Sequence, residues 1–153
     1  MTILYLEDLR PGQRFVGRTR VHIEAERIKS FAAEFDPQGF HLDEGAANAS
    51  LFRGLAASGW HTAAVTMRLL LESEFQPAGG IIGAGFDALR WPRPTRPGDE
   101  LHVESEVLQV RPSQSRPEQG LVKLQTNTLN QHGEVVQVSV GNVVVRCRPK
   151  RVA

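Results

Sequence analysis

Asp36 and His41, two side chains that can exchange protons, lie five positions apart in the segment formed by residues 31–59. Pro37 and Gly39 interrupt regular structure between them, so we expect a loop that brings both side chains into one small volume. A carboxylate beside an imidazole that titrates near neutrality is suited to acid/base chemistry. The same residues also fit an ordinary turn, in which Asp36 bonds the local backbone and His41 is a packed ring.

A second group suited to chemistry is the start of the helix predicted after Ser58. The first turn of a helix has N–H groups without intrahelical partners, and the helix dipole adds a positive potential there. We expect the amides around Gly59 and Trp60 to point outward and to stabilise a negatively charged oxygen. Because Gly59 has no side chain, it allows close approach either by a ligand or by a neighbouring backbone.

The other histidines have no carboxylate partner at a spacing that would favour acid/base chemistry. His61 is predicted to pack in the core rather than face the site, and His22, His102 and His132 are predicted to be surface or packing residues. No cluster has the spacing of a metal site, so we expect no metal ion and no other cofactor. A GxSxG motif and a phosphate-binding glycine loop are also missing. The single cysteine, Cys147, rules out an intrachain disulfide.

The composition narrows the classes of protein that fit. A chain of 153 residues, 41% hydrophobic and 23% charged, is expected to form a single domain over residues 1–153 with one buried core. A formal charge of +1 gives no electrostatic case for nucleic acid or an acidic membrane. No apolar run approaches the roughly 20 residues of a membrane span, and the N-terminus lacks a signal-peptide core. We therefore expect a soluble cytoplasmic protein.

The first elements that must position the site follow from hydrophobic periodicity. Residues 14–23 alternate as a half-buried strand does, and residues 24–35 form an amphipathic helix that Pro37 ends. The spacing of three and four residues places on one face of that helix Ala25, Ile28, Phe31, Ala32 and Phe35.

The second half of the site segment leads into a long helix. A short helical turn is expected over residues 42–50, followed by a loop over residues 52–54, and Ser58 is a good N-cap residue for the next helix. That helix, over residues 59–74, is apolar nearly all round. We therefore predict that it is buried at the centre of the fold.

After Gly80 the pattern changes to strands separated by proline and glycine turns. Strands joined through hairpins form an antiparallel sheet, and the valine-rich alternation requires an apolar partner on one face, which we expect to be the long helix. The fold class predicted is therefore α+β. The four strands are expected over residues 81–91, 100–110, 120–131 and 133–148.

The order of these elements is similar to that of a single hotdog domain, an antiparallel sheet wrapped around a long central helix. The segment FAAEFDPQGFHLDEGAANAS resembles the site signature of the MaoC-like, or (R)-specific enoyl-CoA hydratase, family, in which a His follows an Asp by five positions. The resemblance continues through GLAASGWHTAAVTMRLL and GFDALRWPRPTRPGDEL. The chain differs from the usual signature in having Gln38 and Gly39 where Asn-Pro is common, and Ser58 where His often precedes the helix glycine.

The resemblance implies an acyl-thioester hydratase or dehydratase. In such an enzyme Asp36 and His41 hold the catalytic water, and the amides near Gly59 bind the thioester oxygen. We assign substrate binding to four neighbouring residues, Ser58, Trp60, Arg53 and Arg90. Arginine side chains suit the phosphates of coenzyme A, and an acyl carrier protein would be attracted by the same charges. Further cations available to a carrier are Arg93, Arg96, Arg146, Arg148, Lys150 and Arg151.

Two other functions fit the same fold. A hotdog thioesterase would direct water at the thioester carbonyl, although such enzymes generally lack the Asp-to-His spacing. A non-catalytic acyl-CoA binding module would keep the fold without the chemistry.

A hotdog domain leaves an edge strand and a half-open acyl tunnel, and relatives complete both by pairing two protomers. We therefore expect a homodimer or a higher homo-oligomer. Val143–Val145 is predicted to be the uncovered edge that needs such a partner.

Overall fold

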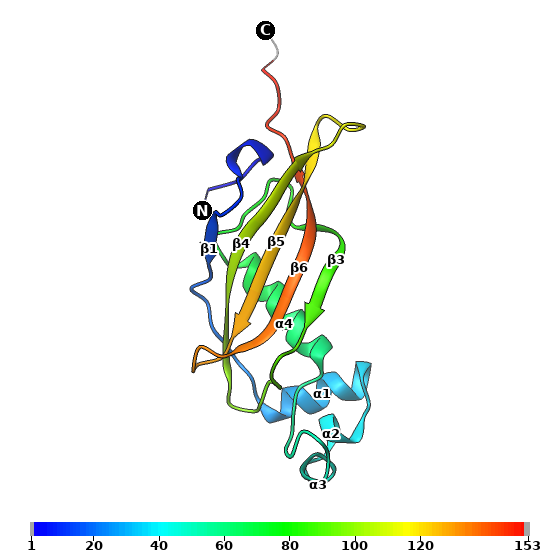
Figure 1. Ribbon diagram of the computed structural model, residues 1–153. Helices are drawn as coiled ribbons and strands as arrows, with labels where there is room; N and C mark the ends of the chain where they lie inside the picture. Colours follow the sequence, from blue (N-terminus) through cyan, green and yellow to red (C-terminus); the bar gives the residue numbers. More distant parts are fainter. Residues whose placement is uncertain (1, 152–153) are drawn as a thin grey trace.

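The computed structural model describes residues 2–151 as an antiparallel sheet with one long helix against it (Figure 1). Three short helices gather at one end of the sheet, and the C-terminal segment leaves at the opposite end. In chain order the elements are η1 (Leu6–Asp8), β1 (Arg14–Val16), β2 (Val21–His22), α1 (Ala25–Phe35), α2 (Gly39–Leu42), α3 (Glu44–Asn48), α4 (Gly59–Leu71), β3 (Ile82–Arg90), β4 (Glu100–Pro112), β5 (Gln119–Leu129) and β6 (Val135–Arg146).

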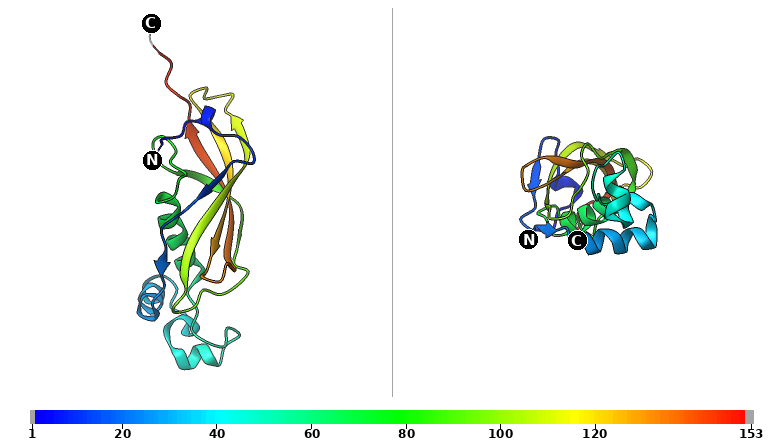
Figure 2. Two further views of the ribbon diagram at one scale, coloured as in Figure 1. Left: turned by 90° about the vertical axis from the view of Figure 1, so that its left-hand side faces the viewer. Right: turned by 90° about the horizontal axis from the view of Figure 1, so that it is seen from below.

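The strand order in the sheet is β1-β4-β5-β6-β3, with β2 also paired to β4, and all pairs are antiparallel. Seen from the side, α4 lies along one face of the sheet and the helices α1 to α3 lie beyond its end (Figure 2). The predicted α+β class, with an antiparallel sheet around a central helix, is confirmed. Across residues 2–151, no helix combines the length and the apolar character that spanning a bilayer requires.

The connection between β3 and β4 differs from the prediction. These strands do not form a hairpin, because β3 pairs with β6 at the far edge and the chain crosses over through residues 91–99. Three prolines in this connection prevent it from continuing the β-ladder. The edge strand beyond β6 is therefore β3, and the prediction for Val143–Val145 was wrong, since these residues lie in β6 between two strands. The predicted strand over residues 14–23 is likewise split into β1 and β2.

One side of α4 is buried against the sheet, and part of that contact is polar. The hydroxyl oxygen of Thr62 lies 3.0 Å from that of Thr95, and the hydroxyl oxygen of Thr66 lies 2.6 Å from that of Thr128. These buried hydroxyls satisfy one another, which removes the cost of burying them unpaired. The helix is thus fixed on the sheet by hydrogen bonds as well as by apolar packing.

The other side of α4 is uncovered, so the prediction of burial all round was wrong. Trp60, Met67 and Leu71 are 59%, 42% and 48% exposed. They recur at helical spacing and form one outward face. Composition alone does not separate the face that the sheet covers from the face that it leaves open. In α1 the prediction also fails at Phe35, which is exposed while Ile28 and Ala32 are buried.

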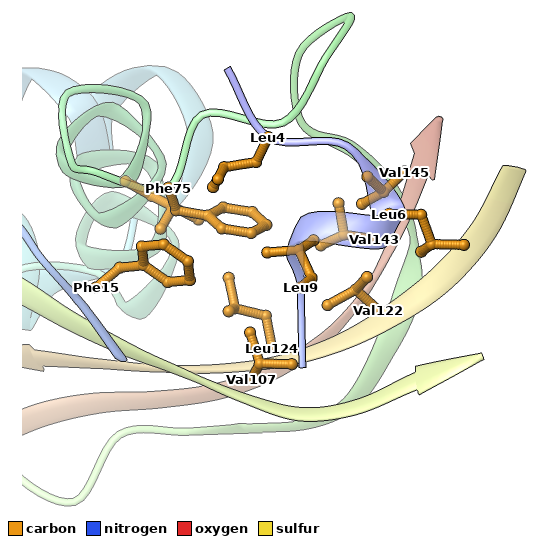
Figure 3. Close-up of a cluster of buried hydrophobic side chains, with 11 residues drawn as sticks. Leu4, Leu6, Leu9, Phe15, Phe75, Val107, Val122, Leu124, Val143 and Val145 are labelled. Atoms are coloured by element: carbon orange, nitrogen blue, oxygen red, sulfur yellow. The ribbon is translucent and has the colours of Figure 1, made fainter. Parts of the chain in front are cut away.

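The sheet and α4 bury two clusters of apolar side chains. The first lies toward the N-terminal segment, where the Phe15 and Phe75 rings meet edge-on at 5.4 Å (Figure 3). The second lies at the site end and joins α1, α3 and the segment before α4 to the sheet through residues that include Ile28, Ala47 and Leu55. This second cluster fixes the elements that carry Asp36, His41 and Gly59.

Candidate active site

Asp36 and His41 lie together where α1 ends and α2 begins. Asp36 is the C-cap residue of α1, and the distance from its Oδ2 to His41 Nε2 is 3.2 Å. His41 belongs to α2, so the open loop expected around Gly39 is partly wrong: this glycine starts a short helix. The backbone bonds from the Gln38 N–H to the Asp36 carbonyl and from the His41 N–H to the Gln38 carbonyl fold the segment tightly. This turn brings the two side chains together.

The His41 ring is held in one orientation. Its Nδ1 lies 2.6 Å from the carbonyl oxygen of Ala56, and the ring is only 4% exposed. A carbonyl oxygen can only accept, so Nδ1 carries the proton of the neutral ring. Nε2, which faces Asp36, then has a free lone pair and can accept a proton. The rings of Phe40 and Phe52 flank His41 at centroid distances of 4.6 and 6.0 Å.

Arg96 fixes the chain just before Ala56. Its guanidinium donates to the carbonyl oxygens of Gly54 at 2.9 Å and Leu55 at 3.2 Å, and also to that of Phe52. The sequence offered Arg96 as a cation for a carrier phosphate, but these contacts use its side chain inside the fold. Arg96 therefore holds the segment whose carbonyl orients His41.

We expect Arg96→Met to loosen this segment. Three carbonyl groups lose a charged donor, so the free energy of unfolding should fall by about 2 kcal/mol. Urea unfolding followed by circular dichroism measures the change, and Arg111→Met, at an exposed position in β4, is the matched control. Equal stability of the two variants would contradict the assigned contacts.

The Asp36 carboxylate receives several hydrogen bonds. Gln38 Nε2 lies 2.6 Å from Oδ1, and the Ser58 hydroxyl is a further influence that favours the ionised carboxylate. Burial raises the pKa of Asp36, but hydrogen bonding by Ser58 and Gln38, and by His41 when its ring is protonated, outweighs this effect and holds the pKa below its usual range. Asp36 is consequently ionised at neutral pH and can accept protons.

Ser58 links α4 to this carboxylate. Its side chain is fully buried, caps α4 by accepting from the Trp60 N–H at 3.2 Å, and helps to lower the pKa of Asp36. The predicted N-cap is therefore confirmed. The expectation of a free amide at Trp60 was wrong, because the cap uses that N–H. The Gly59 N–H, in contrast, donates to no acceptor within residues 2–151.

Gly59 is in close contact with an aromatic ring rather than with a neighbouring backbone. A Cβ atom at this position would lie 2.7 to 2.9 Å from carbons of the Trp91 indole. Trp91 is itself fixed, because its Nε1–H donates to Oε1 of the buried Gln137 at 2.9 Å. The Trp60 ring meets Trp91 edge-on at 5.6 Å. Only glycine fits beneath Trp91 in this arrangement.

One cavity brings these groups together. It has a volume of about 390 Å³ and lies beside the start of α4. His41, Gln38 and Gly59 line it together with aromatic side chains. The cavity therefore joins the imidazole of the proton-accepting pair, a helix-end amide and an apolar wall, as expected of a site for a small polarised ligand. The aromatic residues of its wall are Phe40, Phe52 and Trp91.

The predicted carrier cations are dispersed. Arg53 and Arg90 are exposed, and the cation among the cavity-lining residues described is instead Arg93, whose side chain lies 2.9 Å from Glu134. The C-terminal basic segment lies at the opposite end of the sheet from α2 and α3 (Figure 1). There Arg148 pairs with Asp8.

His61 packs as predicted. It is 6% exposed and stacks on Phe31 at a centroid distance of 4.8 Å. Burial, with Arg27 nearby, lowers the pKa of His61 and keeps the ring neutral. As for metal ions, the described part of the chain contains no group of three or more His, Cys, Asp and Glu side chains close enough to hold one.

Comparison with known proteins identifies the family. The MaoC like domain matches residues 8–128, which is most of the chain. This chain belongs to the MaoC-like domain family. A MaoC-like dehydratase from Rhodospirillum rubrum has 62% sequence identity to it and a TM-score of 0.92, over 96% of this chain and 99% of that one.

Two further proteins are similar to this chain. The uncharacterized protein YdeM of Bacillus subtilis (strain 168) is 34% identical over 126 residues, covering 82% of this chain and 87% of YdeM. An (R)-hydratase from A. caviae involved in PHA biosynthesis has 27% identity and a TM-score of 0.68, over 93% of this chain and 99% of that one. The family resemblance and the hotdog fold expected from the sequence are thereby confirmed.

Proposed function

We propose that this MaoC-like protein adds water to, or removes it from, the α–β double bond of an acyl thioester. The observation that carries the proposal is the 3.2 Å contact between Asp36 and His41, with His41 and the Gly59 amide on one cavity. The (R)-hydratase among the comparison structures supports the same reaction type.

The chemistry requires a proton to be taken from water and one to be given to the α carbon. A water molecule bound by Asp36 Oδ2 and His41 Nε2 loses a proton to the pair as its oxygen bonds the β carbon. The π electrons of the double bond move toward the thioester carbonyl, forming an enolate. The pair then returns its proton to the α carbon as the enolate collapses. Dehydration is the reverse sequence.

The enolate oxygen needs a donor, and the Gly59 N–H fills that role. It is the first residue of α4, and the helix dipole adds a positive potential at that point. Ser58, predicted to contact substrate, is instead assigned a positioning role, since it is buried between α4 and Asp36. Arg93 at the cavity and Trp60, which packs on Trp91 of its wall, are proposed contacts for the substrate, and Arg53 and Arg90 for its carrier. That carrier is coenzyme A or an acyl carrier protein.

The test follows two signals with one substrate, the enoyl absorbance and the free thiol. Wild-type protein with crotonyl-CoA should lose the enoyl absorbance and release no free thiol. Thiol release would overturn the proposal in favour of a thioesterase. Tight binding of acyl-CoA across a chain-length series, without turnover in either direction, would overturn it in favour of a binding module.

We further propose that the working form is a homodimer. The exposed face of α4 (Trp60, Met67 and Leu71) adjoins an edge strand, β3, on which Ile82 and Phe86 are also exposed. An apolar face beside an unpaired strand edge favours pairing with a second copy.

Phe86→Lys is expected to convert the dimer to a monomer, because it places a charge in the proposed contact. Light scattering after size-exclusion chromatography measures the mass. Val16→Lys, at an exposed position on β1 at the other edge of the sheet, is the control and should leave the dimer intact. A wild-type monomer at micromolar concentration would overturn this proposal.

A further inference from the structure

Gln38 makes the shortest polar contact to the Asp36 carboxylate. Its Nε2 lies 2.6 Å from Asp36 Oδ1, whereas the contact with His41 is made by Oδ2, at 3.2 Å. An ionised carboxylate can only accept, so the amide nitrogen of Gln38 is the donor. The two carboxylate oxygens therefore have different partners: Gln38 binds one and His41 faces the other.

This division matters because an aspartate carboxylate turns easily about its last torsion. A donor fixed on Oδ1 stops that rotation and leaves Oδ2 directed at His41. The donor itself is well placed, since Gln38 is the N-cap residue of α2 and its backbone bonds both Asp36 and His41. A charge-assisted hydrogen bond also favours the ionised carboxylate over the protonated one.

We propose that Gln38 is a positioning residue for the acid/base pair: its amide fixes Asp36 Oδ1 and leaves Oδ2 directed at His41 for proton exchange. This inference rests on the proposed hydration activity. Gln38 and Gly39 replace the Asn-Pro of the usual family signature. The Gln38 side chain is exposed, and by this inference it is nevertheless part of the site.

Removal of the amide is the direct test. Gln38→Met keeps the length of the side chain and loses the donor, so kcat/KM on the acidic limb, below about pH 4, should fall about ten-fold. The acidic limb of the pH–rate profile should move up by about one pH unit, because Asp36 protonates more readily. Gln38→Glu adds a like charge, and its limb should move further. The melting temperature at neutral pH should fall by only about 4 °C, because the folded-state pKa of Asp36 moves closer to its unfolded value.

The control is Gln114→Met, at an exposed position in the β4–β5 connection. It should reproduce the wild-type profile. A Gln38→Met profile that superimposes on the wild type after scaling would overturn the inference, because a residue that merely packs does not control the acidic limb.

A second measurement separates this inference from the proposed activity. The pKa of the Asp36 carboxyl can be followed by carbon-13 NMR in the protein without substrate. A rise in Gln38→Met supports the role of Gln38 even if crotonyl-CoA is not hydrated, and an unchanged pKa overturns it even if hydration is observed. Failure of the wild type to hydrate crotonyl-CoA counts against the proposed function alone.

Discussion

Asp36→Asn is expected to lower kcat for enoyl-thioester hydration by roughly 10²- to 10⁴-fold, the usual contribution of a general acid/base group. Asparagine has nearly the same shape and can still contact Gln38 and Ser58, but it cannot accept a proton from water. The loss should therefore appear in kcat while the protein remains folded. Steady-state hydration of crotonyl-CoA measures it, with Glu118→Gln in the distant β4–β5 connection as the control.

The same substitution has a signature in stability. Because the pKa of Asp36 is held below its usual range, its ionisation stabilises the fold above about pH 4, and this contribution is lost as the pH falls through the folded-state value. The unfolding free energy of the wild type should therefore decline more steeply at acid pH than that of Asp36→Asn. An Asp36→Asn variant that retains full activity would refute the assigned role.

Gly59→Ala is the second substitution with a large expected effect. The added methyl group would lie 2.7 to 2.9 Å from Trp91, closer than real Cβ contacts, so the ring or the start of α4 must shift. Overpacking of this kind costs roughly 1–3 kcal/mol. Displacing the Gly59 N–H by a fraction of an ångström should also lower kcat about 100-fold. Urea unfolding and hydration kinetics measure the two effects.

A double variant separates the two roles of Gly59. Trp91→Leu in the Gly59→Ala background removes the ring that the methyl group would strike, so both stability and kcat should recover in part relative to Gly59→Ala. Trp91→Leu alone is the reference for the cycle. Full activity in Gly59→Ala would show that the amide at this position takes no part in the reaction.

The elements of the fold were predictable because their signals are local. Helix periodicity and Pro37 located α1, and turn residues separated the three long strands β4, β5 and β6. The pairing of β3 with β6 was not predictable, because the residue pattern of a strand does not indicate which strand it pairs with. Pairing of consecutive strands through a hairpin is the simplest expectation. Nor did the apolar pattern of α4 reveal which face the sheet covers, because Thr62 and Thr66 face inward while Met67 faces solvent.

At the candidate site, the spacing of Asp36 and His41 and the start of the helix at Gly59 were readable from the sequence. The groups that orient them were not. The hydrogen-bond partner of the His41 ring is the backbone carbonyl of Ala56, and every residue type has such a carbonyl, so the sequence does not indicate this contact. The roles of Trp91 and Arg96 depend on a connection between distant strands. Ser58 was recognised as a helix cap, but its effect on the pKa of Asp36 depends on tertiary structure.

Because β3 pairs with β6, the candidate site is completed only after the last strand has been synthesised. Asp36, His41 and Gly59 belong to the first half of the chain and leave the ribosome early. Trp91, which covers Gly59, depends on Gln137 in β6, the last strand to be synthesised. A nascent chain thus carries every proton-handling group before it has the wall that encloses them. Long-range pairing of this kind forms late in folding, so the protein should gain activity only with its final strand in place.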